Sequence, residues 1–425
     1  MSNARPLGLW SATALVVGSM IGSGAFLLPS ALAPFGLASL AGWAVTLCGA
    51  LLLAATFARL TALWPQSGGP YIYARNAFGE FAGFTVAWSY WVSVWCANAA
   101  IAVAFAGSLG ALVPATTATP LRGAACALAA LWICTLVNLA GVREAGRMQV
   151  VTTVLKLVPL LLFGVVAVWS IDPSSLRFNP SGGSFASVTQ STVALTLWAL
   201  LGLEAATVPA GAVHDAERTV PRATLLGTLL AGIATVLACS TVVALLPGPQ
   251  LASSSAPMAD AARLLWGPTA GIALAAVMAV SCFGALNGWV LVCGQVSLAA
   301  ARDGVFPSPF ARCDARGTPV AGVLIGTLLS SVLVLSNYSH SLVQLFTFSI
   351  LLSTAATLVP YVASTAAWLR QRGQPGRVLA ALALIYALYA LVGTGREALA
   401  WGAVLILAGM PLYAWRRFAA RARPT

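Results

Sequence analysis

Long apolar segments separated by short polar loops follow one another along the whole chain. About twelve of these segments come near the ~20 residues that a helix needs to cross a bilayer. Their approximate centres are Met20, Gly49, Val94, Trp132, Pro159, Leu200, Thr235, Val280, Leu328, Ala356, Tyr386 and Leu407. The pattern predicts an all-α membrane protein with about twelve transmembrane helices. We expect the first segment to belong to the fold and not to be a cleaved signal peptide.

The first apolar segment is interrupted in its middle by Gly18-Ser19-Met20-Ile21-Gly22-Ser23-Gly24. Glycine destabilises a helix interior, and a membrane offers no water to bond an unpaired backbone group. Unwound backbone at this depth is tolerated where it lines a cavity and its free amides meet a ligand. The segment therefore predicts a binding site formed by main chain.

A second interruption lies in the sixth segment, at Gly202 within residues 194–207. It comes five predicted spans after the first interruption, so the two spans should cross in opposite directions. Two interrupted spans at matching places in oppositely oriented halves indicate an inverted-repeat secondary transporter. Glycine used for close helix packing is the alternative for either interruption alone. We predict one transmembrane domain over residues 1–425, with inverted repeats at about 8–172 and 186–370 and two further spans at about 376–416.

The composition agrees with a membrane setting, because 60% of the residues are hydrophobic and 8% are charged. Soluble domains carry about 25% charged residues. The net charge of +12 does not indicate nucleic acid, because the arginines follow the loops. With the N-terminus inside, 17 arginines fall in cytoplasmic segments, and those outside are Arg122, Arg177, Arg263 and Arg396. By the positive-inside rule we expect both termini to be cytoplasmic. The positive charge then orients the protein in a lipid bilayer.

Cysteine and histidine give no sign of a metal site or a disulfide framework. The eight cysteines lie mostly within apolar segments and form no CxxC pair, which favours a role as small packing side chains. His214 and His340 fall in loops on opposite sides of the membrane. We expect neither a metal nor another cofactor.

The apolar pattern places one acidic residue, Glu204, inside a span, and it also places Lys156 inside a span. Glu204 follows the break at Gly202 and could carry a proton, face a cationic substrate or hold a gate shut. A protonated acid that bonds a neighbouring helix is the alternative. Lys156, the only lysine, has an ammonium that can release a proton, which a guanidinium cannot do. It could replace a coupling sodium ion or act as a proton site, and snorkelling to the interface is the alternative.

Two of the fourteen tryptophans stand next to an interruption or a glycine within a span. Trp198 precedes the second break by about one turn, and Trp289 follows Asn287-Gly288. An indole face can bind an ammonium or guanidinium group through cation–π attraction. Interfacial or lipid-facing packing is the alternative for both.

Three motifs resemble those of the amino acid–polyamine–organocation (APC) transporters, and the resemblance covers essentially the whole chain. Gly22-Ser23-Gly24 is similar to the family's first-span substrate loop. Ser67-Gly68-Gly69-Pro70-Tyr71-Ile72-Tyr73-Ala74-Arg75 with Phe78-Gly79 resembles its signature between the second and third spans. Glu217-Arg218-Thr219-Val220-Pro221-Arg222-Ala223 resembles the loop after the sixth span. Within the family, Trp198-Ala199-Leu200-Leu201-Gly202-Leu203-Glu204 is similar to the sixth span of the bacterial arginine/agmatine antiporter and the basic amino acid/polyamine antiporters.

The resemblance implies a LeuT-like 5+5 inverted-repeat core with broken spans 1 and 6, in a bacterial inner membrane, and dimerisation is a family expectation only. It implies substrate binding by Ser19, Met20, Gly22, Ser23, Gly24, Asn98, Trp198, Leu201, Trp289 and Ser353. The main-chain amides of Ser23 and Gly24 would bind a substrate carboxylate. The implied gating residues are Tyr90, Trp198, Glu204, Trp289 and Tyr361, and those linked to coupling or pH are Lys156, Glu204 and Tyr71.

Two departures from the arginine/agmatine antiporter bear on the substrate. Lys156 has no counterpart there and resembles the fifth-span lysine of sodium-independent neutral amino acid permeases. Ser19 and Ile101 replace an asparagine and a methionine. We predict an alternating-access exchanger of a cationic, arginine-like amino acid for a related amino acid or amine. The alternative is a proton-coupled, sodium-independent permease or exchanger for neutral amino acids.

Two other classes of membrane protein fit the sequence less well. An embedded enzyme that uses Lys156 or Glu204 would need a nucleophile or metal cluster beside them, and no motif supplies one. A channel would need a ring of filter residues, which one subunit does not repeat, although an oligomer would escape that argument. We therefore expect a transporter and not an enzyme.

Overall fold

The computed structural model describes residues 8–66, 68–140, 145–207, 213–314, 317–371 and 373–421, with only the backbone described at 145–152, 155, 175 and 416–421. Apart from one isolated bridge residue, Val213, these residues form helices and their connections, with no strand. The helices are α1 Leu9–Met20, α2 Ser23–Leu32, η1 Ala33–Ala38, α3 Ser39–Leu63, α4 Pro70–Phe78, α5 Glu80–Leu112, η2 Pro114–Thr116, α6 Pro120–Leu139, α7 Ala145–Ala167, η3 Val168–Ser170, η4 Pro173–Ser175, α8 Phe185–Trp198, α9 Ala216–Leu245, α10 Gly248–Ser253, α11 Pro257–Trp266, α12 Pro268–Arg302, η6 Ser308–Ala311, α13 Val320–Ser336, α14 Leu342–Arg370, α15 Arg377–Gly393, α16 Gly395–Leu407 and α17 Met410–Arg421.

Seven helical segments of the described chain are long and apolar enough to cross a membrane. They are Leu9–Leu63, which joins α1, α2 and α3, and Glu80–Leu112, Pro120–Leu139, Ala216–Leu245, Pro268–Arg302, Leu342–Arg370 and Gly395–Trp415. The shorter apolar helices are Lys156–Ser170, Val320–Ser336 and Arg377–Gly393. The prediction of an all-helical membrane protein is confirmed. The count of twelve spans, the inverted repeat and the domain limits stay predictions.

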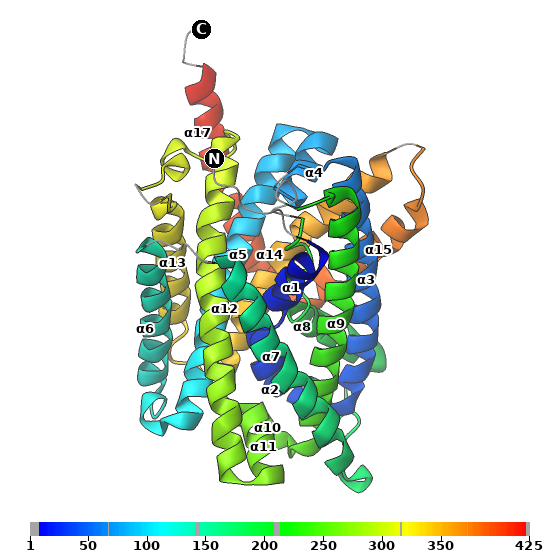
Figure 1. Cartoon of the computed structure of the whole chain (residues 1–425), viewed down its shortest axis with the longest axis vertical. Coiled ribbons are helices and arrows are strands. Elements are labelled where there is room, and N and C mark those ends of the chain that lie inside the picture. The colour runs from blue at the N-terminus through cyan, green and yellow to red at the C-terminus, as the bar shows by residue number, and fades with distance from the viewer. Residues whose placement is uncertain are drawn as a thin grey trace.

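The long helix α5 lies in the middle of the bundle, packed against α14 on one side and α12 on another (Figure 1). Its side chains are buried over most of its length, including Trp91 and Asn98. A helix that is apolar on every side is expected to be covered by neighbours on every side. α5 can therefore present side chains to an interior cavity.

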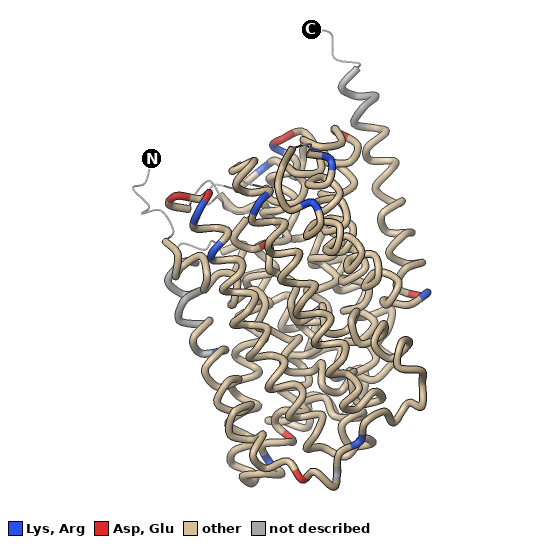
Figure 2. Tube along the Cα trace, turned by 90° about the vertical axis from the view of Figure 1, so that its right-hand side faces the viewer, with Lys and Arg blue, Asp and Glu red and all other residues tan. Residues whose placement is uncertain are grey.

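Charged side chains gather at the two ends of the bundle, and lysine and arginine are more frequent at the end that carries α4 and α17 (Figures 1 and 2). This end includes Arg75 of α4 and the last residues of α12 and α14, Arg302 and Arg370. α10 and α11 lie at the opposite end (Figure 1). Such an asymmetry is the arrangement that the positive-inside rule describes. Which end faces the cytoplasm stays a prediction.

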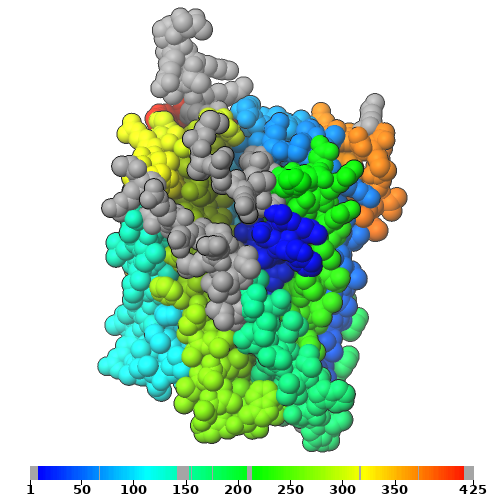
Figure 3. All heavy atoms as spheres, viewed as in Figure 1, coloured from blue at the N-terminus to red at the C-terminus, as the bar shows by residue number. Residues whose placement is uncertain are grey.

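The side of the bundle between these ends is apolar. On the face drawn in Figure 3, α12, α7 and α9 form much of the surface, and the start of α1 reaches it beside them. The exposed side chains of these three helices include Leu162, Val280 and Ile233. Water-soluble proteins rarely expose apolar surface of this extent, so the bundle requires a bilayer around it.

Candidate functional site

The predicted break in the first apolar segment is present and is shorter than the glycine-rich sequence suggested. α1 ends at Met20, the chain bends at Ile21-Gly22, and α2 begins at Ser23. The amides of Gly22, Ser23 and Gly24 have no backbone hydrogen-bond partner among the described residues, because the first turn of a helix lacks preceding carbonyls. The Ser23 hydroxyl is buried, also without a partner in that part of the chain. Several hydrogen-bond donors are therefore left for a ligand.

The second predicted break is longer than the first. α8 ends at Trp198, and residues 199–207 form successive turns. The amides of Leu200 and Leu201 bond to carbonyls three residues earlier at 2.9 and 3.2 Å, so the helix tightens before it stops. Gly202 follows with φ +100°, a conformation that glycine adopts without the strain of a side chain.

The two breaks contact each other and run in opposite directions. A β-carbon placed on Gly24 would lie 2.9 Å from Cα of Ala199, and one placed on Gly202 would lie 3.0 Å from Cβ of Ser19. At the first break Ser19 precedes Gly24, but their contacts at the second break, Gly202 and Ala199, come in the reverse order. The two segments are therefore antiparallel. Their backbones approach so closely that a side chain at either glycine would require a shift.

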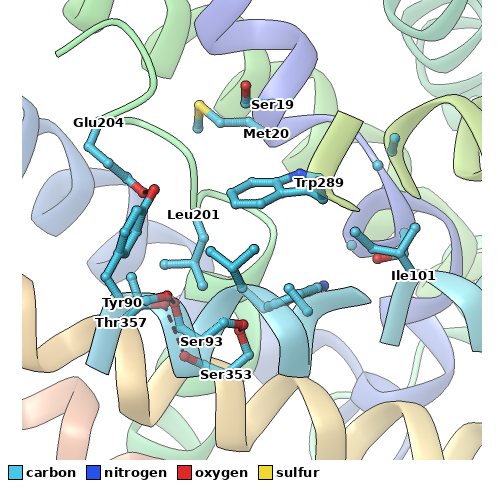
Figure 4. Close-up of a pocket in the computed structure, with 17 residues that line it drawn as sticks. Ser19, Met20, Tyr90, Ser93, Ile101, Leu201, Glu204, Trp289, Ser353 and Thr357 are labelled. Atoms are coloured by element: carbon cyan, nitrogen blue, oxygen red, sulfur yellow. Dashed lines mark hydrogen bonds between the residues drawn. The ribbon is translucent and has the colours of Figure 1, made fainter. Parts of the chain in front are cut away.

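A cavity lies between the two breaks and the helices α5, α12 and α14 (Figure 4). Its lining consists of Ser19, Met20, Gly22, Ser23, Gly24, Tyr90, Ser93, Val94, Ala97, Ile101, Trp198, Leu201, Glu204, Ala285, Trp289, Ser353 and Thr357. Its volume is about 30 Å³, counted as the space open to the centre of a water molecule. That space holds one or two waters, so an amino acid requires the walls to move apart.

Nine of the ten predicted substrate-binding residues line this cavity, and Asn98 does not. Asn98 is buried on α5, and its side-chain oxygen has no hydrogen-bond partner among the described residues. Four of the five predicted gating residues also line the cavity, whereas Tyr361 lies behind Glu204. Lys156 and Tyr71, predicted for coupling or pH, lie outside the lining.

Sequence reasoning did not identify five of the lining residues, namely Ser93, Val94, Ala97, Ala285 and Thr357. Each shares a helix face with a residue that was identified. The first three follow Tyr90 on α5, Ala285 precedes Trp289 by one turn, and Thr357 follows Ser353 by one turn. Helical spacings of three and four around the identified residues would have found them. Ser353 also fixes α14 to α5, since its hydroxyl donates to the Ser93 carbonyl at 2.8 Å.

Glu204 joins three parts of the protein at one end of the cavity. Its two carboxylate oxygens accept hydrogen bonds from the Tyr90 hydroxyl at 2.8 Å and the Tyr361 hydroxyl at 2.5 Å. Tyr90 belongs to α5, Tyr361 to α14 and Glu204 to the second break. All three are buried, with Glu204 only 1% exposed, and Figure 4 shows Tyr90 and Glu204 meeting at the cavity edge. Separation of these elements would break both bonds.

Two indole rings border the same space. Figure 4 shows Trp289 projecting from α12 between Met20 and Leu201. Trp198 covers Gly24, whose β-carbon would lie 3.1 Å from the indole Cδ1. The ring nitrogen of Trp198 is buried without a partner in the described residues. The aromatic faces and the carboxylate of Glu204 together suit a cationic group.

Lys156 is buried on α7 beside α1, with 4% of its surface exposed. One turn earlier, the Thr153 hydroxyl donates to the carbonyl of Ala14 at 3.0 Å, which fixes α7 against α1. None of the described carboxylates forms an ion pair with the ammonium of Lys156. Tyr71 is buried on α4, and its hydroxyl has no partner within the described ranges. No group of three or more His, Cys, Asp or Glu that could hold a metal comes together in those ranges.

Comparison with known proteins finds relatives over almost the whole chain. The model of the amino acid permease family matches residues 7–414. The chain is 32% identical to the putrescine transporter PotE of Escherichia coli K12, over 97% of each protein, and 31% identical to PotE of Haemophilus influenzae, again over 97% of each. It is also 31% identical to the cadaverine/lysine antiporter of Escherichia coli K12, over 97% of this chain and 96% of that protein. The chain therefore belongs to the amino acid permease family of the APC superfamily, which confirms the resemblance of its motifs.

Proposed function

We propose that this amino acid or amine transporter exchanges a cationic, arginine-like amino acid for a related amino acid or amine by alternating access. The observation that carries the proposal is the contact between the two broken helices beside a buried cavity. Broken helices within a membrane supply helix ends and free backbone groups that bind charged substrates. The relatives are named as transporters of putrescine and of cadaverine and lysine, which supports a substrate with an amino group at the end of an alkyl chain.

The α-carboxylate of the substrate would bind at the start of α2. The amides of Gly22, Ser23 and Gly24 have no backbone partner in the described chain, and the positive end of the helix dipole attracts an anion. The α-ammonium would lie near the carbonyl ends of α1 and α8, where the helix dipoles are negative. Every amino acid carries these two groups, so this end of the cavity does not select the side chain.

The cationic side chain would lie among Trp198, Trp289 and Glu204. The indole faces attract a cation, and Glu204 is the only acidic side chain among the described residues that line the cavity. A cation at Glu204 would compete with the hydroxyls of Tyr90 and Tyr361 for its oxygens. Substrate binding would thus favour the opening of this end, since a ligand shifts a conformational equilibrium through contacts that differ between the states.

The membrane arrangement that we propose has twelve spans, of which the first ten form a LeuT-like 5+5 inverted repeat and the last two follow it. The antiparallel contact of the two breaks supports it, because an inverted repeat brings its broken spans together in opposite directions. The arginine-rich end near α4 would face the cytoplasm, together with both termini. The bilayer would be a bacterial inner membrane, and a homodimer is part of the proposal on family grounds only.

Lys156 favours a second candidate function, a proton-coupled, sodium-independent permease or exchanger of neutral amino acids. Its ammonium is buried beside α1 without an ion-pair partner among the described carboxylates. A fixed positive charge there would replace a coupling sodium ion and would disfavour a doubly charged amine. An ammonium that released its proton during the cycle would instead couple transport to a pH gradient.

Counterflow into proteoliposomes distinguishes the two functions. Vesicles are loaded with unlabelled arginine, agmatine or alanine, and the uptake of a labelled amino acid is followed with and without a pH gradient. Exchange predicts uptake into loaded vesicles only, fastest when arginine or agmatine is inside. Net uptake into empty vesicles that follows the pH gradient would rule out obligate exchange. Uptake without saturation or stereoselectivity would contradict both functions and indicate a channel.

If the Lys156 charge takes the place of a coupling sodium ion, its substitution by methionine is expected to raise the KM for exchange of an amino acid by about tenfold, equivalent to ~1.4 kcal/mol. Methionine removes the charge at similar length, whereas arginine keeps the charge but cannot release a proton. If exchange needs only a fixed positive charge, the KM of Lys156→Arg should be closer to the wild-type KM than that of Lys156→Met. Proton coupling through Lys156 predicts that both variants lose uptake driven by a pH gradient.

The matched control for these variants is Thr153→Val, which removes the neighbouring bond to Ala14 without a change of charge. It should leave the response to the pH gradient unchanged. Wild-type kinetics and a wild-type gradient response in Lys156→Met would end the hypothesis that this lysine takes part in transport.

A further inference from the structure

We propose that Asn138 and Asn287 form a positioning pair that holds Trp289 in the substrate cavity. The inference rests on the proposed function, in which Trp289 forms part of the wall that binds a cationic substrate. Neither asparagine belongs to the cavity lining. Both would therefore act through Trp289 and not by contact with substrate.

The pair connects α6 to α12 through side-chain hydrogen bonds. The amide nitrogen of Asn138 donates to the side-chain oxygen of Asn287 at 2.9 Å and to its main-chain oxygen at 3.1 Å. It also contacts the carbonyl of Cys134, one turn earlier on α6, at 2.8 Å. Asn138 is fully buried; its amide nitrogen is hydrogen-bonded, and its side-chain oxygen has no partner among the described residues. Amide bonds of this kind fix one membrane helix against another.

Helix geometry places Asn287 and Trp289 on opposite sides of α12. Two residues along an α-helix correspond to a rotation of about 200°. Asn287 faces α6, to which it is bonded, and Trp289 faces the cavity. A rotation of this part of α12 would turn both side chains together. The bond to Asn138 therefore sets the direction in which Trp289 points.

The remaining contacts of α12 resist such a rotation on one side only. Leu286 and Val290 are packed, with 0% and 1% of their surfaces exposed. On the other side, a β-carbon at Gly284 or Gly288 would meet no heavy atom within 4 Å in the described part of the chain. Glycine also permits more backbone freedom than other residues. Asn287 lies between these two sides, about 60° around the helix from both Val290 and Gly284. The asparagine pair thus adds a contact at the margin where the packing of α12 ends.

A double-mutant cycle between Asn287→Ala and Trp289→Leu tests whether the first residue acts through the second. Counterflow with labelled arginine and with labelled alanine gives the KM for each substrate and their ratio. Trp289→Leu is expected to raise the KM for arginine by about tenfold and to reduce the preference for arginine over alanine. Asn287→Ala should shift the same two quantities in the same direction, by about three- to tenfold.

The double variant should resemble Trp289→Leu alone to within about twofold, since a positioning residue has no effect once its target is gone. The matched control is Thr135→Val, which removes the Thr135–Thr327 bond of 2.7 Å between α6 and α13. This bond is also buried, and it does not involve α12. The control should leave the arginine-to-alanine ratio unchanged, alone and combined with Trp289→Leu.

The inference would be overturned if the effects of Asn287→Ala and Trp289→Leu on the KM for arginine multiply in the double variant. It would also be overturned if Asn287→Ala has the wild-type ratio of the KM values for arginine and alanine. A Trp289→Leu variant with wild-type kinetics would instead contradict the proposed function, and the inference with it. Asn287→Ser keeps an acceptor oxygen for Asn138 and should recover most of the wild-type ratio. If Asn287→Ala does not fold, a wild-type ratio in folded Asn138→Ala, which removes the bonds to both the side-chain and the main-chain oxygen of Asn287, overturns the inference.

Discussion

Glu204→Gln is expected to reduce exchange of a cationic substrate by about 10- to 100-fold, because a hydrogen bond to a charged group is worth ~1.5–3 kcal/mol. The substitution keeps the size of the side chain and removes its charge. It also replaces one of the two oxygens that accept from Tyr90 and Tyr361 with an amide NH2 group, which can only donate. Counterflow with labelled arginine measures the rate and the KM of the variant against wild type.

A second variant separates the two roles that Glu204 could have in this result. Tyr361→Phe removes the bond of 2.5 Å on the side away from the cavity and leaves the carboxylate in place. If Glu204 mainly closes the cavity, Tyr361→Phe should change the rate as Glu204→Gln does. If Glu204 mainly binds the cation, Tyr361→Phe should keep the wild-type KM for arginine.

The control for this pair is Glu80→Gln, at an ion pair with Arg75 that is half exposed and distant from the cavity. It should behave as wild type, because exposed ion pairs contribute little. A wild-type rate and a wild-type KM in Glu204→Gln would exclude both roles. Glu204 would then serve only to hydrogen-bond neighbouring helices.

The two helix breaks were predictable from sequence because their cause is local. Gly22 and Gly202 each lie within an apolar segment long enough to form one continuous helix, and glycine destabilises a helix interior. The structure interrupts the helices at both places. The break lengths were not predictable, since they depend on contacts across the bundle. Ser19 and Gly24 contact the second break, at Gly202 and Ala199.

The partners of Glu204 illustrate what a single sequence does not contain. Its depth in the membrane follows from hydropathy, but Tyr90 and Tyr361 lie 114 and 157 residues away along the chain. No helical period connects positions on different helices, so only the family resemblance nominated them. The same resemblance nominated Asn98, which the structure places outside the cavity lining.

Lys156 and Asn287 show the same limit in two further ways. Hydropathy gave the depth of Lys156 but not its direction around α7, and the side chain is buried outside the cavity lining. Asn287 was noticed only as a neighbour of Trp289. Its bond to Asn138 could not be inferred, because periodicity assigns a residue to a face but does not say which helix covers that face.

Gly24→Ala is expected to reduce transport more than tenfold while the protein still folds, since overpacking typically costs ~1–3 kcal/mol. The new methyl group would lie 2.9 Å from Cα of Ala199, 3.1 Å from its Cβ and 3.1 Å from Cδ1 of Trp198. Two of these atoms are fixed to backbone and cannot turn away. The breaks would have to separate, which would displace the free amides of α2 from the place proposed for the substrate carboxylate. The measurement is counterflow by protein that elutes as a single species.

Gly402→Ala is the matched control, because its β-carbon would meet only Cβ of Ala355 at an ordinary 3.7 Å on the peripheral helix α16. It should transport as wild type. A further substitution, Ala199→Gly in the Gly24→Ala protein, removes one of the three close contacts and should restore part of the activity. The recovery would tie the loss to the contact between the breaks, because general damage to the fold has no reason to be repaired by a glycine on another span. Wild-type transport by Gly24→Ala would mean that the breaks do not hold substrate between them at this distance.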